Sequence, residues 1–354
     1  KITEEAIANS SAKLIPKNCV IVAMYGATAA KACINKIPLT TNQACCNLQI
    51  DEKQAHYKYA YYWICNEYER LRAQGEGSQT NLNAKKIKSY PIPVPPLRVQ
   101  ARIVEILDKF TQLEAELEAE LEARNKQYDF YRNRLLDFAH RDDFDGKVEW
   151  TTLGKVCLQL RTGLNPRNNF KLNTDDASNY YVTVRELGGT ELIYSEKTDL
   201  INDHALQLIN NRSKLKVNDI LFSGTGTIGK TAFIAEEPSN WNIKEGVYAL
   251  TLDTRYVLPM FVLRYLQSQR AIDWIERMAA GSTVRSITMR NLEQLPFPLP
   301  PLSEQRRIVE ILDRFDTLTN SISEGLPREI ALRRKQYEYY LDALLRFPPP
   351  TTTA

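Results

Sequence analysis

Residues 91–110 read PIPVPPLRVQARIVEILDKF, and residues 296–315 read PFPLPPLSEQRRIVEILDRF. Fourteen of these twenty positions are identical, at a constant offset of 205 residues, so the chain contains an internal duplication. In each copy a proline-rich segment, which cannot continue a helix, comes directly before an amphipathic segment. The duplication predicts two units with the same plan: a globular part, a proline elbow and a long helix.

The similarity continues on both sides of this segment. Downstream, RNKQYDFYRNRLLDF (124–138) matches RRKQYEYYLDALLRF (333–347) at an offset of 209, so the second copy has gained four residues. Upstream, GEGS (75–78) matches AAGS (279–282), and VIVAMYGATAAKACI (20–34) matches ILFSGTGTIGKTAFI (220–234). Ile2 aligns with Ile201, and the second unit opens near Val148. Units of equal length would therefore place roughly fifty further residues ahead of Lys1.

Apolar residues recur at three- and four-residue spacing after each elbow, which predicts two long helices. The first should run from about Gln100 to Phe138, and its middle is the tandem repeat EAEL EAEL (114–121), whose Glu side chains we expect on the outer face. The second should begin near Ser303 as an N-cap, with Gln305 close behind, and break at Gly325 and Pro327. We expect the two helices to form an antiparallel pair.

A phosphate-binding motif is present by pattern, because residues 224–231 read GTGTIGKT and match G-x-x-x-x-G-K-T. A P-loop must open a helix, but only six residues separate Thr231 from Pro238, and they suit a strand. In the first copy Ala30 and Ala32 take the places of Gly229 and Thr231. We therefore interpret the segment as a turn, and a P-loop nucleotide hydrolase stays as an unfavoured alternative.

Composition sets further bounds. The six cysteines form no C-x-x-C pair and the three histidines are widely spaced, so we expect reduced thiols in a cytoplasmic protein and no metal site. No apolar run approaches the roughly 18 residues of a membrane helix, so no membrane partner is expected. The net charge of +3 permits nucleic-acid binding without establishing it.

The arrangement resembles the specificity subunit of type I restriction–modification systems. The resemblance covers the whole chain and is carried by the duplicated P-x-P-x-P-P-L…Q-x-R-I-V-E-I-L-D-[KR]-F segment, the VEW-x-x-LG opening at 148–154 and the KQY-x-x-Y segments at 126–131 and 335–340. The EAEL tandem is similar to the short repeat in the central helix of one subgroup of that family.

The resemblance implies a fold of the α+β (α/β) class, with two pseudo-repeated target-recognition domains joined by two long antiparallel coiled-coil helices. The corresponding segments are 1–96 for the first recognition domain, 97–147 for the first helix and linker, 148–302 for the second domain, 303–347 for the second helix and 348–354 for a tail.

The resemblance also implies a function. Each domain would read one half of a bipartite site in double-stranded DNA, and the helix pair would set the gap between the halves. Two modification subunits would bind S-adenosylmethionine and methylate adenine, and two restriction subunits would use ATP and Mg. The chain itself would perform no chemistry, and Asn or Asp precedes Pro-Pro nowhere in it, unlike in the adenine-methylase tetrad.

DNA reading needs cations for phosphates and planar polar side chains for base edges. Candidates gather in polar, turn-rich stretches. In the second domain they are Arg161, Asn165, Arg167, Asn168, Asn211, Arg212, Lys214, Lys230, Ser282, Thr283, Arg285 and Arg290. In the first domain they are Lys31, Gln43, Ser78, Gln79, Lys85 and Lys86. A coiled-coil adaptor without a DNA role is a second alternative.

Overall fold

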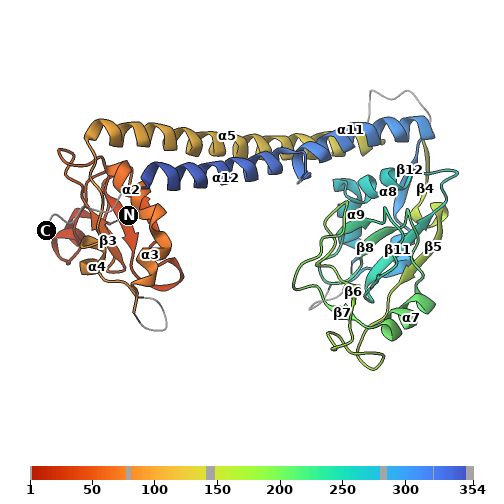
Figure 1. Ribbon diagram of the computed structural model, residues 1–354. Helices are drawn as coiled ribbons and strands as arrows, with labels where there is room; N and C mark the ends of the chain where they lie inside the picture. The colour runs from red at the N-terminus through yellow and green to blue at the C-terminus, as the bar shows by residue number, and fades with distance from the viewer. Residues whose placement is uncertain (1, 77–80, 141–147, 280–284, 322, 348–354) are drawn as a thin grey trace. The chain divides into compact units, whose positions relative to one another are not determined.

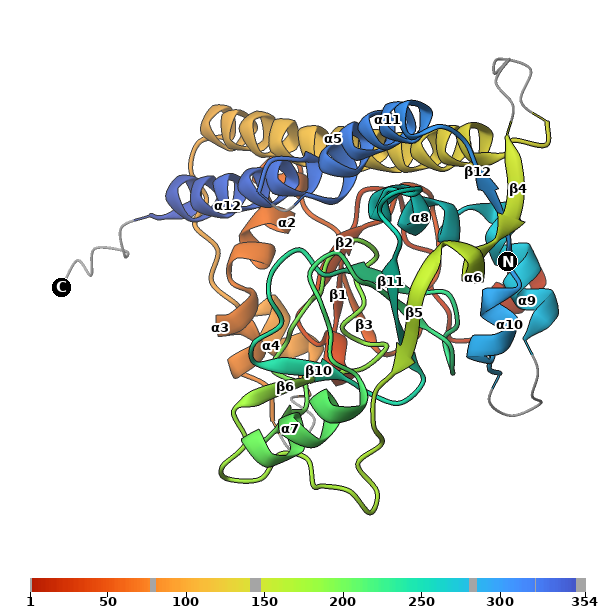
Figure 2. The same cartoon turned by 90° about the vertical axis from the view of Figure 1, so that its right-hand side faces the viewer.

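The computed structural model of the chain describes residues 2–76, 81–140, 148–279, 285–321 and 323–347 (Figure 1). The chain divides into two compact units: residues 1–121 with 322–354, and residues 122–321. Each unit contains a globular part and segments of the long helices (Figure 2). The two units are described separately below.

The long helices follow the amphipathic segments. Helix α5 (Leu97–Leu136) is a single helix of 40 residues, and α11 (Leu302–Asn320) and α12 (Leu326–Leu345) together correspond to it. The predicted interruption near Gly325 therefore separates α11 from α12. The prediction that Ser303 is the N-cap was wrong, because the cap is Pro301, without a side-chain hydrogen bond, and Ser303 lies inside the first turn.

In the first unit α12 runs antiparallel to α5. The rings of Phe110 and Tyr340 stack across the pair. Arg334 donates hydrogen bonds to Glu114 and, at 2.6 Å, to Glu118. These two residues begin the two EAEL repeats and bind the partner helix, while Glu116, Glu118 and Glu120 are exposed.

The globular part of the first unit has one antiparallel sheet of three strands, in the order β2-β1-β3. The core lies between this sheet and short helices, and is closed by Ile64, Leu71 and Ile87. Its elements are α1 (Glu4–Ala8), β1 (Val20–Ala23), η1 (Gly26–Thr28), β2 (Ala32–Ile34), β3 (Cys45–Leu48), α2 (Tyr57–Asn66), α3 (Tyr68–Ala73) and α4 (Ala84–Lys88).

Within residues 148–279 and 285–321, the globular part of the second unit contains three sheets. A four-stranded antiparallel sheet has the order β5-β11-β8-β9, a mixed sheet has the order β10-β6-β7, and β12 pairs with β4. Its elements are β4 (Glu149–Thr152), α6 (Leu153–Val156), β5 (Cys157–Thr162), β6 (Asn179–Val182), β7 (Leu200–Ile201), α7 (Asp203–Arg212), β8 (Ile220–Ser223), β9 (Thr231–Phe233), β10 (Trp241–Ile243), β11 (Val247–Leu252), α8 (Pro259–Leu266), α9 (Gln269–Met278), α10 (Met289–Glu293) and β12 (Pro296–Leu299).

A buried glutamine fastens the globular part of the first unit to its long helix. Gln100, in the first turn of α5, is fully buried. Its Oε1 accepts a hydrogen bond from the backbone N–H of His56 (2.8 Å), which precedes α2. Its Nε2 donates to the carbonyls of Pro95 (2.7 Å) and Gln54 (3.2 Å). The side chain thus satisfies three backbone groups of the joint.

The second unit repeats this arrangement through Gln305, which is also fully buried. Its Oε1 accepts from the N–H of Leu258 (2.8 Å), which precedes α8, and its Nε2 donates to Pro300 and Tyr256 (both 2.9 Å). The position of Gln305 near the start of the helix suggested a role in capping. Its side chain instead joins the helix to the globular part of the second unit. Helices α2 and α8 are equivalent elements.

A second contact of the joint is also repeated. The indole N–H of Trp63 on α2 donates to the carbonyl of Pro91 (3.1 Å), and the hydroxyl of Tyr265 on α8 donates to the carbonyl of Pro296 (2.6 Å). The first proline of each elbow thus presents its carbonyl to a polar aromatic side chain. The repeated sequence therefore makes equivalent hydrogen bonds at the joints of both units.

Candidate nucleic-acid interface

Residues 224–230 form the turn of a β-hairpin between β8 and β9. The N–H of Ser223 donates to the carbonyl of Lys230 (2.8 Å), and the N–H of Gly229 donates to the carbonyl of Ser223 (3.0 Å). Gly226 and Gly229 have φ values of 78° and 90°, which favour glycine. A strand, not a helix, follows Lys230, so the interpretation of the segment as a turn is confirmed.

Thr231 holds the base of this turn. Its hydroxyl donates to the carbonyl of Gly189 (2.7 Å) and accepts from Nε2 of Gln267 (2.8 Å), and the residue is buried. In a P-loop the corresponding hydroxyl is a Mg²⁺ ligand. Here the hydroxyl of Thr231 is engaged by Gly189 and Gln267, which argues against a P-loop nucleotide hydrolase.

The first unit contains the matching turn. The N–H of Ala23 donates to the carbonyl of Lys31, and the N–H of Ala30 donates to the carbonyl of Ala23 (both 2.9 Å). Ala30 has a φ of 69° and takes the place of Gly229, as predicted. The first turn is one residue longer, so the offset between the copies is 200 at Ala23 and Ser223 and 199 at Ala30 and Gly229. Lys31 and Lys230 are therefore equivalent, and both side chains are exposed.

In each unit a later segment binds this turn through its backbone. The N–H of Ile287 donates to the carbonyl of Gly224 (2.9 Å), and the N–H of Leu82 donates to the carbonyl of Met24 (2.8 Å). A Cβ on Gly224 would lie 2.2 Å from the ring of Tyr248, so glycine is needed there. The segments 285–290 and 81–86, both rich in candidate cations, thus lie beside the turns that carry Lys230 and Lys31.

Short helices continue these segments and place further cations. Asn83 caps α4 and Thr288 caps α10, each with a side-chain hydrogen bond. Lys85 and Arg290 occupy the same position in the two helices, and both are exposed. Arg285 is exposed too, and its guanidinium donates to the carbonyl of Glu276 in α9 (2.7 Å). The structure therefore places exposed Lys230 on the turn, and exposed Arg285 and Arg290 on the segment that binds the turn.

A second group of candidates lies around α7. The loop after β5 carries Arg167 and Asn168, which are exposed, and Asn165, which is half-buried. The loop packs through Leu164 and Phe170 on the apolar cluster of Ile209. Exposed Asn211, Arg212 and Lys214 end that helix or directly follow it. Among the residues that the structure describes, no hydrogen bond or ion pair joins this group to Lys230, Arg285 or Arg290.

Two candidates are occupied in internal contacts. Arg161 is buried, and its guanidinium binds Asp219, Thr251 and Gln159 within the four-stranded sheet. Its assignment to the interface is therefore corrected, because a guanidinium desolvated and paired in this way is not available to a phosphate. Lys86 is half-buried and pairs with Glu76, so it is a weaker candidate than Lys85.

Of the remaining candidates, the structure describes one. Gln43 is exposed in the loop before β3. Ser78, Gln79, Ser282 and Thr283 lie outside the described residues. Within those residues, no ion pair engages Lys31, Lys85, Lys230 or Arg290, and no group of His, Cys, Asp and Glu could hold a metal ion.

Comparisons with known proteins agree with this geometry. The family model for the type I restriction modification DNA specificity domain matches residues 1–123 and 147–332. The chain is 36% identical over 314 residues to the type I restriction enzyme EcoR124I/EcoR124II specificity subunit of Escherichia coli, covering 86% of this chain and 74% of that protein.

Two solved structures share the fold. One is described as the structural basis underlying complex assembly and conformational transition of the type I R-M system (TM-score 0.65, 18% identity, 95% of this chain and 84% of that chain). The other is the type I restriction-modification S subunit from M. genitalium (TM-score 0.56, 17% identity, 95% and 85%).

The two-fold repeat, the joints and these matches define a class: the chain belongs to the type I restriction–modification DNA specificity family. It is a specificity subunit, whose role is DNA sequence recognition. In the parts of the chain that the structure describes, no helix has the length and apolar character of a membrane span.

Proposed function

We propose that each globular part reads one half of a bipartite site in double-stranded DNA. The observation that carries this proposal is the repetition of one cationic turn: Lys31 with Lys85 in the first unit, and Lys230 with Arg290 in the second. Exposed cations on equivalent elements suit phosphate oxygens, which fix the register of a protein on a duplex.

Base reading in the second unit falls to the neighbouring planar donors. Arg285 beside the turn and the α7 group can make paired hydrogen bonds to base edges in the major groove. These stretches differ between the two units, whereas the same glutamine fastens both joints, and this supports two different half-sites read by one scaffold.

The helix pair sets the gap between the half-sites and holds two modification subunits, to which two restriction subunits add. S-adenosylmethionine, ATP and Mg²⁺ belong to those partner subunits in this proposal. Specificity subunits of this class are generally non-catalytic, and we assign no reaction to this chain.

The test is co-expression of the complete subunit with its neighbouring methylase, followed by genome-wide mapping of methylated adenine. Two short half-sites around a fixed gap are expected. Co-purification without such a motif would make the chain a scaffold, as the adaptor alternative has it, and would overturn the proposal. Abolition of an ATPase of the isolated chain by Lys230→Ala would instead favour the nucleotide hydrolase.

A further inference from the structure

The two equivalent joints differ in how they pair the same aspartate of the repeat. In the first, Tyr62 on α2 donates its hydroxyl to Asp108 of α5 (2.7 Å). In the second, Arg264 on α8 donates to Asp313 of α11 (2.8 Å). Asp108 and Asp313 are the same residue of the sequence repeat, so Tyr62 and Arg264 are equivalent.

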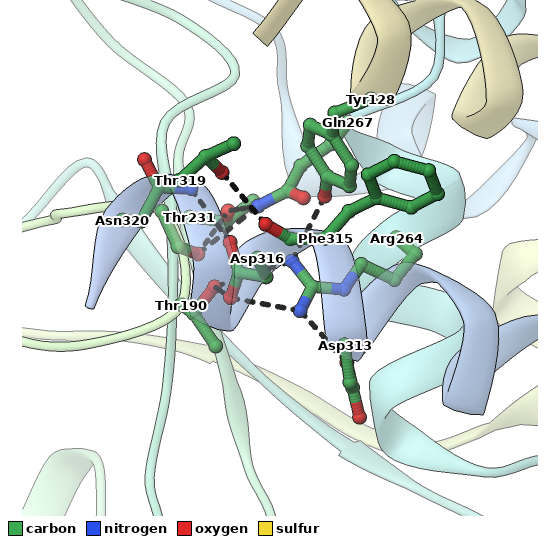
Figure 3. Close-up of polar contacts among 11 residues, drawn as sticks. Tyr128, Thr190, Thr231, Arg264, Gln267, Asp313, Phe315, Asp316, Thr319 and Asn320 are labelled. Atoms are coloured by element: carbon green, nitrogen blue, oxygen red, sulfur yellow. Dashed lines mark hydrogen bonds and ion pairs between the residues drawn. The ribbon is translucent and has the colours of Figure 1, made fainter. Parts of the chain in front are cut away.

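Arg264 is buried in a way that is unusual for a cation. Its residue is 1% exposed, and its guanidinium binds Asp316 (3.0 Å), the hydroxyl of Tyr128 (3.0 Å) and Thr190 as well as Asp313 (Figure 3). A buried cation is tolerated only when paired and hydrogen-bonded. The first unit has Thr111 where the second has Asp316, and its Asp108 pairs with the half-buried Lys58, so the buried guanidinium and the second carboxylate occur together.

The ionisation of this group is consistent with the pairing. Burial by itself lowers the pKa of Arg264, but Tyr128, Asp316 and Asp313 outweigh it and the pKa is raised. Burial raises the pKa of Asp316, but Arg264, Asn320 and Thr190 together outweigh it, so the pKa lies below its usual value.

The same contacts lead to the cationic turn. Thr190 donates to Asp316 (3.1 Å) and follows Gly189, whose carbonyl accepts from Thr231 (2.7 Å). Thr231 directly follows Lys230. Figure 3 shows Thr190 and Asp316 beside the guanidinium, and Nε2 of Gln267 donates to the hydroxyl of Thr231 (2.8 Å). Hydrogen bonds and two peptide links therefore connect α11 to the turn.

We propose that Arg264 and Asp316 are a positioning pair, which fixes the reading turn of the second unit against its long helices and distinguishes this joint from that of the first unit. The pair acts through Thr190 and Thr231 and touches no DNA. The inference rests on the proposed function, since it concerns how accurately one half-site reader is held.

The test introduces the joint residues of the first unit at the equivalent positions of the second unit. R264Y alone leaves Asp316 buried without its cation, whereas R264Y/D316T installs the Tyr62–Thr111 pair beside Asp313. M260K/R264Y/D316T also adds the counterpart of Lys58, which pairs with Asp108. Spin labels at exposed Thr227 in the turn and exposed Glu310 on α11 report their separation in the complete subunit.

We expect one narrow distance distribution for the natural chain, a broadened one for R264Y, and recovery of a narrow one with the transplant. In the methylation maps, R264Y should methylate sites with a less uniform second half-site or a more variable gap, and the transplant should not. An R264Y distribution as narrow as the natural one, with only a lower melting temperature, would overturn the proposal. If R264Y does not fold, the label distances in R264Y/D316T are compared with those in D316T. Distance distributions that are equally broad in these two variants would overturn the proposal.

The two levels of failure are separable. A natural complex that yields no bipartite methylation motif contradicts the proposed function, whatever the variants do. A natural complex with a clear motif, combined with unchanged label distances in R264Y, contradicts only the positioning role.

Discussion

The ring of Phe110 stacks on that of Tyr340, with centroids 5.1 Å apart and planes inclined by 25°. Their repeat counterparts Phe315 and Tyr131 stack in the second unit at 5.5 Å and 26°. Offset stacking of this kind favours one relative position of two helices. Each unit therefore has its own fixed crossing of the same two helix types.

Removing cations from the turn face of the second unit should weaken DNA binding without changing the preferred sequence. For K230A/R290A we expect lower affinity on all duplexes, and a slope of log affinity against log salt that is shallower by about one to two units. Lys197→Ala, at an exposed lysine in the loop before β7, is the control. Binding titrations at several salt concentrations measure both, and equal slopes for the two variants would contradict the assignment.

Shortening the EAEL tandem should change the gap and nothing else. Deletion of residues 118–121 removes about 6 Å of helix against about 3.4 Å per base pair, so the gap should shrink by one or two base pairs. Glu122 then takes the place of Glu118 opposite Arg334. Methylation mapping measures the gap. Glu118→Ala keeps the length of the helix and should retain the original gap. An unchanged gap after the deletion would show that this helix does not set the gap.

The joint glutamines should contribute more to stability than exposed glutamines. Gln305→Ala leaves one N–H and two carbonyls of the joint without their partner, at a cost of about 1–3 kcal/mol. Gln112, exposed on α5, is the control, and Gln112→Ala should stay within about 0.5 kcal/mol. Denaturant unfolding measures both, and equal values would argue against the joint.

The first unit should lose stability in mild acid through His56. Burial and the charge of Lys58 lower its pKa below 6.5, against the opposite effects of Asp108 and Glu52. Neutral His56 accepts the N–H of Lys58 as the cap of α2 (3.2 Å). Because the unfolded chain binds the proton more tightly, this stabilisation is present above about pH 6.5 and is lost as pH falls through the folded pKa.

The control for His56 is built into the repeat, because Leu258 occupies the same place ahead of α8. His56→Leu should lose about 1 kcal/mol of capping at neutral pH and should show a smaller change in unfolding free energy between pH 8 and 5.5 than the natural chain. The same change in both proteins would mean that His56 does not titrate in the folded state.

The repeat in the sequence accounts for much of this architecture. Proline placement and apolar spacing predicted α5 to within three residues at its start and two at its end, and they located the break before α12. Ala30 in the place of Gly229 identified the turn without any coordinates. These features depend on local rules, which a single sequence displays.

The missed features depend on tertiary contacts. Gln100 and Gln305 were identical in both copies, yet a polar residue at a helix start also suits a cap, and only the fold shows their backbone partners. Arg161 lies in a polar stretch typical of a loop, but it belongs to β5, where Asp219 from a distant part of the sequence pairs with it. Spacing along one segment carries no information about such a partner.

The duplicated elbow has a consequence for the gene. Two stretches of coding sequence that specify the same joint lie 205 codons apart in one reading frame. A crossover between them would keep the frame and retain the glutamine and the aspartate of the joint, because Gln100 corresponds to Gln305 and Asp108 to Asp313, while Thr111 and Asp316 would be exchanged. What such an exchange adds, deletes or replaces is a whole reader together with its helix, so new target sequences can be inherited as cassettes.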